Sequence, residues 1–167
     1  MAASLTVPIA RKTPLTENKS QAAGRESVDA ILDRCKGSLI QNWLARTKKT
    51  PQLNHLHLSD DERTEHLPKL VDDLVVRLRR STSSDKDENA VASPAAIEHG
   101  QLRRTQGYSP GMLIHESRLL QVTIFGILQE NLGVLDFNVL LPDVMIIADE
   151  VDSQLTQTMD RFTNGAP

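Results

Sequence analysis

Residues 95–132 read AAIEHGQLRRTQGYSPGMLIHESRLLQVTIFGILQENL, and this stretch decides the fold because it predicts two helices joined by one tight corner. Gly107 supplies the left-handed residue that commonly ends a helix. Ser109 is a favourable N-cap, and Pro110 suits the first helical position, where its missing N–H has no consequence. The first helix therefore ends near Gln106 and the second begins at Pro110.

The helix after Pro110 has an apolar stripe that predicts burial against a core. Its members are Met112, Leu113, Leu119, Leu120, Ile124, Ile127, Leu128 and Leu132. Glu116 falls inside this stripe, where a solvent-facing residue is not expected. A polar group in this position makes the corner a candidate functional site.

Further polar residues gather at the same corner. His99, Arg103 and Gln106 are spaced by four and three residues, so they share one face of the first helix. Together with Tyr108 and Glu116 they form the predicted polar corner, which is either a ligand-binding or a structural cluster. Arg103 and Glu116 are placed to form an ion pair across it. Such a pair fixes the register of two helices if it is buried and contributes little if it is half exposed.

The rest of the chain adds three more predicted helices, giving an all-α bundle of about five helices. The first runs from Ser27 to about Arg46, and a second begins with the capping-box pair Ser59 and Glu62. Pro68 kinks that helix or starts a new segment. Residues 1–24 are expected to be a disordered tail, residues 25–164 one helical domain, and residues 81–93 a mobile polar connector within it.

The last predicted helix runs from about Asp136 to Phe162 and has a near-heptad apolar seam. The seam consists of Phe137, Leu141, Val144, Ala148, Val151, Leu155 and Phe162. An alternating three-four spacing of this length is typical of a coiled-coil-like contact with a partner helix. The sequence therefore predicts a homodimer.

Composition narrows the class of protein. Aromatic residues make up only 3% of the 167 residues, so the core is aliphatic, and the net charge of −3 gives no reason to expect nucleic acid as a partner. The chain has one cysteine, Cys35, which fits a reducing compartment. It has no run of about 18 apolar residues and no signal-peptide core. We expect a cytoplasmic protein with no contact with membranes.

The polar corner also carries a resemblance to a known family. The pattern from His99-Gly100 through Arg103 to Gln106-Gly107-Tyr108-Ser109, followed by Glu116 and Arg118-Leu119-Leu120, resembles the N-terminal domain of the RsbR-type stressosome co-antagonist family. Ser117 departs from the pattern, since an aromatic residue is expected after the glutamate. The resemblance implies a haem-free, globin-like sensor domain, usually dimeric, that lies upstream of a signalling output domain.

This resemblance predicts a non-catalytic regulatory module in a bacterial stress or two-component-type pathway. No output domain follows in this sequence, so we expect it either to act on a separate kinase or regulator or to be a sensor fragment. The alternative is a histidine phosphotransfer protein with His99 or His115 as the phosphoacceptor. His115, Glu116 and Arg118 match the core of a phosphoacceptor helix, but the chain has no Gly-rich phosphate loop.

Other chemistry is less well supported. A haem on His99 lacks aromatic residues to line its cavity, and we expect His99 to hydrogen-bond to Gln106 or Tyr108. His55, His57 and His66 are a weak metal pattern without a neighbouring cysteine. Residues with the order of a catalytic triad are not evident. The sequence therefore predicts no metal, no cofactor and no enzymatic activity.

Overall fold

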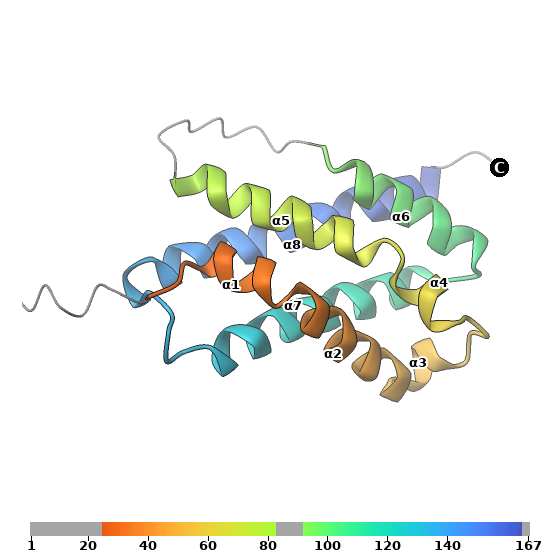
Figure 1. The fold of residues 1–167 in the computed structure, drawn as a ribbon. Coiled ribbons are helices and arrows are strands. Elements are labelled where there is room, and N and C mark those ends of the chain that lie inside the picture. Colours follow the sequence, from red (N-terminus) through yellow and green to blue (C-terminus); the bar gives the residue numbers. More distant parts are fainter. Residues whose placement is uncertain (1–24, 83–91, 165–167) are drawn as a thin grey trace, which may run out of the picture.

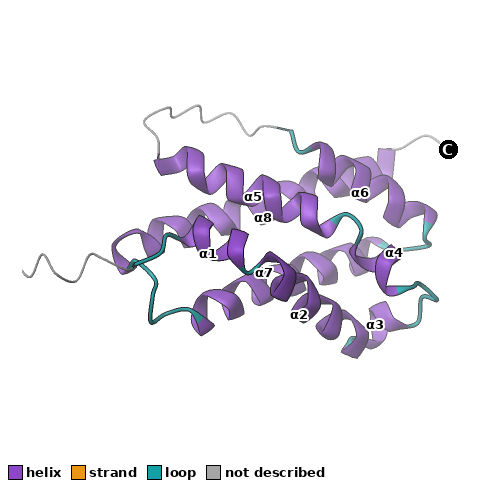
Figure 2. Ribbon diagram, in the orientation of Figure 1, coloured by secondary structure: helices purple, strands orange, loops and turns teal. Residues whose placement is uncertain are grey.

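The computed structural model describes residues 25–82 and 92–164. The helices in these ranges are α1 (Val28–Arg34), α2 (Lys36–Lys49), α3 (Pro51–Asn54), α4 (Asp60–Thr64), α5 (Leu67–Thr82), α6 (Pro94–Thr105), α7 (Pro110–Glu130) and α8 (Phe137–Asn164). The described residues form no strand, apart from one isolated bridge between Glu26 and Leu135 (Figure 2). The all-α prediction is confirmed, but the helices are more numerous than the five expected.

The additional helices come from breaks at particular residues. The first predicted helix is interrupted at Cys35, whose backbone leaves the helical region, although its carbonyl still accepts a hydrogen bond from Leu39 N–H. The second predicted helix begins at Asp60 with the expected capping box, then breaks after Thr64. A new helix, α5, starts one residue before Pro68, because proline is tolerated in a first turn.

The central corner is present where the sequence places it. Gly107 has a φ of +80°, and it lies between the end of α6 and the start of α7. Ser109 accepts a hydrogen bond from the backbone N–H of Met112, and Pro110 occupies the first turn. These local contacts turn the chain sharply and bring α6 beside the first turns of α7.

The helices pack around one main core. In Figure 1, α5 and α6 lie above α1 and α2, α8 runs behind them, and α7 lies along the lower side. Helix α8 contacts α5, α6 and α7, and α2 contacts α7. The core is largely aliphatic, with Trp43 as its single tryptophan; its central members include Ile31, Leu39, Leu74, Ile124, Ile127 and Ile147.

The predicted seam on α8 divides into two halves. Phe137 and Leu141 are exposed, whereas Val151 is buried in the main core. Leu155 and Phe162 pack against a second apolar cluster formed by Leu53, Tyr108, Met112 and Leu113. Val144 and Ala148 are half-buried. The C-terminal half of the seam is therefore used within the monomer, and only the N-terminal half faces outward.

The face of α8 that turns inward is largely polar. Its buried residues are Asp143, Ile147, Glu150, Val151, Gln154 and Thr158. Gln154 Nε2 donates to the carbonyl of Leu70, and Thr158 Oγ1 donates to the carbonyl of Ala96. These hydrogen bonds satisfy side chains that the apolar spacing alone assigns to solvent.

The predicted tail, residues 1–24, lies outside the described residues, as do residues 83–91 of the predicted connector. The ends of that connector belong to helices: Ser81 lies in α5 and Ser93 caps α6. The Ser93 hydroxyl donates to Asp73 and accepts from Ala96 N–H. Among the described residues, no helix combines the length and the apolar character needed to cross a membrane.

Candidate functional site

The predicted polar corner converges on Glu116, which projects from α7 and is only 4% exposed. Its carboxylate accepts hydrogen bonds from Arg103 Nε at 3.1 Å and from Tyr108 OH at 2.8 Å. Arg103 Nη2 lies 3.0 Å from Oε1 of Glu116, and His99 Nε2 lies 3.3 Å from Oε2 of the same carboxylate. The structure thus brings α6, the corner and α7 together on one buried carboxylate.

We call the cluster of His99, Arg103, Gln106, Tyr108 and Glu116 the hub. Arg103 is its second centre. Its Nη1 donates to the carbonyl of Glu62 and to Gln106 Oε1, and its Nη2 donates to the carbonyl of Arg63. With the Nε bond to Glu116, the guanidinium makes four hydrogen bonds, and its Nη2 also forms the ion pair with the carboxylate. The guanidinium also stacks over the Tyr108 ring, 4.8 Å from its centroid. Arg103 therefore ties α6 to both α4 and α7.

The contacts set the charge state of the hub. Burial alone raises the pKa of the Glu116 carboxyl, but the hydrogen bond from His99 and the charge of Arg103 outweigh it and lower this pKa below the usual value. Burial and the neighbouring carboxylate raise the pKa of Tyr108. Glu116 is thus a carboxylate and Tyr108 a neutral donor at neutral pH.

Two other residues of the site were not predicted. Trp43 Nε1 donates to the backbone carbonyl of Glu116 at 3.3 Å, so α2 also contacts the hub. Arg63 is buried, and its guanidinium donates to the carbonyls of Leu53, Leu56 and Leu58. The spacing of Arg63, four residues before the buried Leu67, was the available signal that it faces inward.

His99 has a different partner from those predicted. We expected Gln106 or Tyr108, but these side chains bond to Arg103 and Glu116 instead. The His99 ring lies against that of His66, with centroids 6.1 Å apart. The Nδ1 atoms of both rings are buried without a hydrogen-bond partner, although Glu65 approaches His66 Nδ1 at 3.2 Å.

A small cavity of about 40 Å³ adjoins the hub. Its polar wall includes His99, Ser117, Gln154 and Thr158, and its apolar wall is formed mainly by leucines. This volume is large enough to admit water. The small side chain of Ser117, in the position where the resemblance leads us to expect an aromatic ring, contributes to the space.

The remaining candidates lie apart from the hub. His55 and His57 are exposed, His115 is half-buried on α7, and Cys35 is half-buried between α1 and α2. Within the described ranges, no three histidine, cysteine or acidic side chains are grouped so as to hold a metal ion. The weak histidine pattern near the start of α4 does not come together.

Comparisons of the chain with models of protein families, with curated proteins and with solved structures gave no match. The interpretation of the site therefore rests on its own geometry, and the family resemblance stays a prediction.

Proposed function

We propose that the chain is a cytoplasmic, non-catalytic regulatory module that forms a homodimer and acts on a separate signalling protein, either a kinase or another regulator. The globin-like sensor character implied by the RsbR-type resemblance belongs to this proposal. Two features support it, the outward face of α8 and the bonding of the hub.

The observation that carries the proposal is a row of exposed apolar side chains at the start of α8. Phe137, Leu141 and Met145 are 55%, 71% and 68% exposed, and their spacing of four residues aligns them along one face. Leu132 and Val134, just before the helix in sequence, are also exposed. We call these five residues the outer row. Contiguous apolar surface of this kind marks an interaction site, and a symmetric pair of such rows is the simplest way to cover it.

The bonding of the hub favours a structural over a catalytic role. Arg103 and Glu116 are almost completely buried, and they form an ion pair with each other. His99 directs Nε2 to the carboxylate, and its side chain is only 12% exposed. A phosphoacceptor histidine must reach the active site of a kinase, so the alternative phosphotransfer function is disfavoured at His99. Of the two predicted phosphoacceptors, His99 and His115, only His115 remains a candidate.

Light scattering on the full chain tests the proposal. We expect the mass of a dimer, and we expect the double variant Leu141→Asp, Met145→Asp to have the mass of a monomer, because two charges in the outer row cannot be buried without partners. Ile114→Asp is the matched control. Ile114 is 52% exposed near the start of α7, which packs beside the C-terminal half of α8, away from the outer row.

A monomeric wild type would contradict the proposal, as would a control that dissociates as readily as the double variant. In either case the phosphotransfer alternative is tested by incubation with a phosphodonor kinase. Acid-labile phosphate that is lost in His115→Gln would support the alternative.

A further inference from the structure

The contact between the α4–α5 junction and α6 contains two histidines in an unusual arrangement. His66 is the last residue before α5, and His99 lies in the middle of α6. Their rings are 6.1 Å apart, their side chains are 15% and 12% exposed, and neither Nδ1 has a hydrogen-bond partner. A buried polar atom without a partner calls for an explanation in a folded protein.

The hub determines which ring nitrogen of His99 carries a proton. Glu116 accepts from Arg103 and Tyr108, and as a carboxylate it can only accept, so His99 Nε2 acts as a further donor. In the neutral ring, the remaining atom, Nδ1, carries a lone pair. A second proton there would place an N–H in the interior with no acceptor, beside the His66 ring.

Charged groups approach this pair from several neighbouring elements. They are Glu65 in the α4–α5 junction, Lys69 at the start of α5, Glu98 and Arg103 on α6, and Glu116 on α7, while α8 contributes the neutral Gln154 and Thr158 to the adjoining cavity. Burial lowers the pKa of His66, a proton on His99 and the charges of Arg103 and Lys69 lower it further, and Glu65 partly opposes them. The closed contact thus favours a neutral His66.

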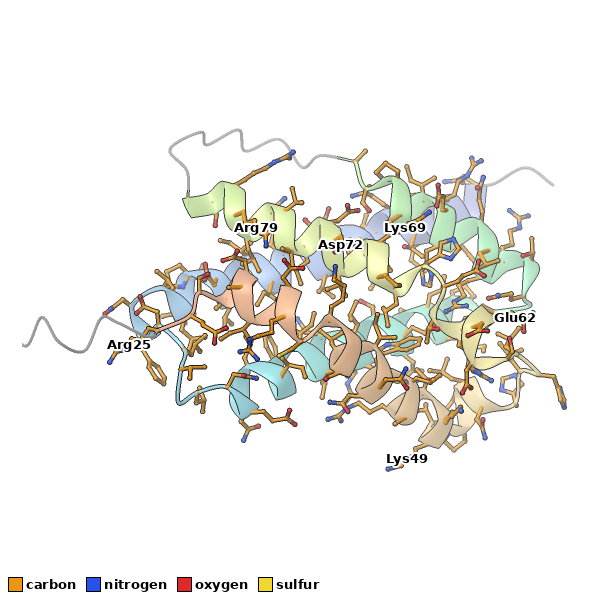
Figure 3. All side chains as sticks on the ribbon, viewed as in Figure 1. Arg25, Lys49, Glu62, Lys69, Asp72 and Arg79 are labelled. Carbon is orange, nitrogen blue, oxygen red and sulfur yellow. The ribbon has the colours of Figure 1, made fainter. Side chains whose placement is uncertain are left out.

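The junction can act as a hinge, because residues 65 and 66 belong to neither α4 nor α5. The α4 side is attached to α6 by hydrogen bonds from Arg103 and Gln106 to the carbonyl of Glu62. The α5 side is attached by the exposed ion pair between Lys69 and Glu98, at 2.8 Å. Figure 3 shows Glu62 and Lys69 on either side of this junction. The Arg63 carbonyl of α4 also accepts a hydrogen bond from Arg103 Nη2, and Leu67 and Leu70 of α5 are buried. Opening the junction breaks these contacts and exposes both imidazoles to water.

We propose that the His66–His99 contact is a proton-operated latch, which is closed while both rings are neutral and opens the α4–α5 junction away from α6 when a ring takes up a proton. The latch goes beyond the proposed function, since a monomer would contain it as well. It gives the fold a response to acidification close to the range in which histidine ordinarily titrates.

Hydrogen exchange of the full chain between pH 8 and pH 5.5 tests the latch, once intrinsic exchange rates are corrected for. As the pH falls, we expect the opening equilibrium of residues 59–70 to rise by up to about tenfold per pH unit for each proton taken up. The His66→Gln variant should take up one proton fewer on opening, because the amide cannot be protonated. Its opening equilibrium should therefore change less steeply with pH. His57→Gln is the control: His57 is exposed in the preceding loop, and its variant should keep the wild-type slope.

Protection of residues 59–70 that does not change with pH would overturn the latch, and so would a His66→Gln variant with the wild-type slope. If that variant fails to fold, NMR titration of the imidazole signals in the wild type decides. Uptake of a proton by His66 or His99 together with loss of protection supports the latch, and uptake without that loss overturns it.

Discussion

Glu116 and Glu150 are both buried carboxylates, 4% and 7% exposed, but their surroundings have opposite effects. At the hub, hydrogen bonds and the Arg103 charge outweigh burial and lower the pKa of Glu116. On the inner face of α8, burial dominates and raises the pKa of Glu150, although Gln154 donates to it and Arg77 lies 3.5 Å away. The groups around Glu116 outweigh the cost of burying its charge, whereas the groups around Glu150 do not.

Asp143 extends this contrast along α8. It is also buried, and burial together with the nearby charge of Asp29 raises its pKa. Buried charge therefore has different effects at the hub and on the inner face of α8. The hub uses it to fix the relative positions of helices, whereas the inner face of α8 carries acidic groups that oppose folding at neutral pH. Local compensation, rather than burial itself, decides whether a charge stabilises the fold.

The largest effect should follow from removing the compensation at the hub. In Arg103→Met, the buried carboxylate loses its cation, the carbonyl of Arg63 loses its donor, and the carbonyl of Glu62 keeps only Gln106 as a donor. We expect the free energy of unfolding to fall by about 3–5 kcal/mol, measured by urea denaturation at pH 7. The control is Arg34→Met, which breaks an exposed ion pair with Glu26 and should cost under about 1 kcal/mol.

A double variant sharpens this prediction. Arg103→Met combined with Glu116→Leu removes both charges, so it should recover much of the loss in the single variant. Equal losses for Arg103→Met and Arg34→Met would show that the hub does not depend on its ion pair, and the contrast between the two regions would fail.

An intermediate effect is expected at the crossing of α6 and α8, which joins the two regions. A Cβ at Gly100 would lie 2.4 Å from the backbone carbonyl oxygen of Thr158 and 3.2 Å from Arg161 Cβ. Gly100→Ala must therefore push the helices apart, and we expect a loss of about 1–3 kcal/mol in thermal or urea unfolding. Amide exchange should show greater loss of protection in α8 near Thr158 than at the hub, whose contacts do not cross this point.

Gly126→Ala is the matched control for that substitution. Gly126 lies within α7, and its added Cβ would meet nothing closer than Arg46 Nη2 at 3.9 Å. Alanine is the better helix former, so this variant should gain about 0.5–1 kcal/mol. A Gly100→Ala variant that is as stable as Gly126→Ala would mean that the crossing can relax freely.

The sequence predicted the features that depend on local spacing. Gly107 and Ser109 placed the corner, and the steps of four and three residues from His99 through Arg103 to Gln106 placed the polar cluster on one face. Glu116 was recognised because it interrupts an apolar stripe. Each of these inferences involves residues that are close in the chain, for which helix geometry fixes the relative positions.

Contacts between distant residues were beyond such reasoning. Spacing shows which side chains of α8 share a face, but two faces compete, and the prediction chose the row that begins with Phe137. The polar face turns inward because Gln154 and Thr158 find carbonyl partners on α5 and α6. Likewise, His66 and His99 are 33 positions apart in the sequence, and only packing of the α4–α5 junction against α6 brings them together.

The smallest effect on stability is expected at Glu150, on the inner face of α8. Its sign is the opposite of the effect expected at Glu116. Because the pKa of Glu150 is raised in the folded state, the folded protein binds more protons than the unfolded one between the ordinary carboxyl pKa and the raised value. Stability at this site therefore increases as the pH falls through that window, and the ionised side chain is unfavourable at pH 7. Glu150→Gln should be as stable as the wild type or up to about 1 kcal/mol more stable at pH 7.

That gain should shrink towards pH 4, where the wild-type carboxyl becomes neutral as well. Glu116→Gln is the counterpart: the lowered pKa of Glu116 means that its stabilisation is present above the ordinary carboxyl pKa and is lost as the pH falls through the folded value. This variant should lose about 1–3 kcal/mol at pH 7 and less in acid. Urea midpoints of both variants at pH 7, 5 and 4 measure the two trends. A destabilised Glu150→Gln at pH 7 would show that Arg77 compensates Glu150 after all, and the two buried carboxylates would then belong to one class.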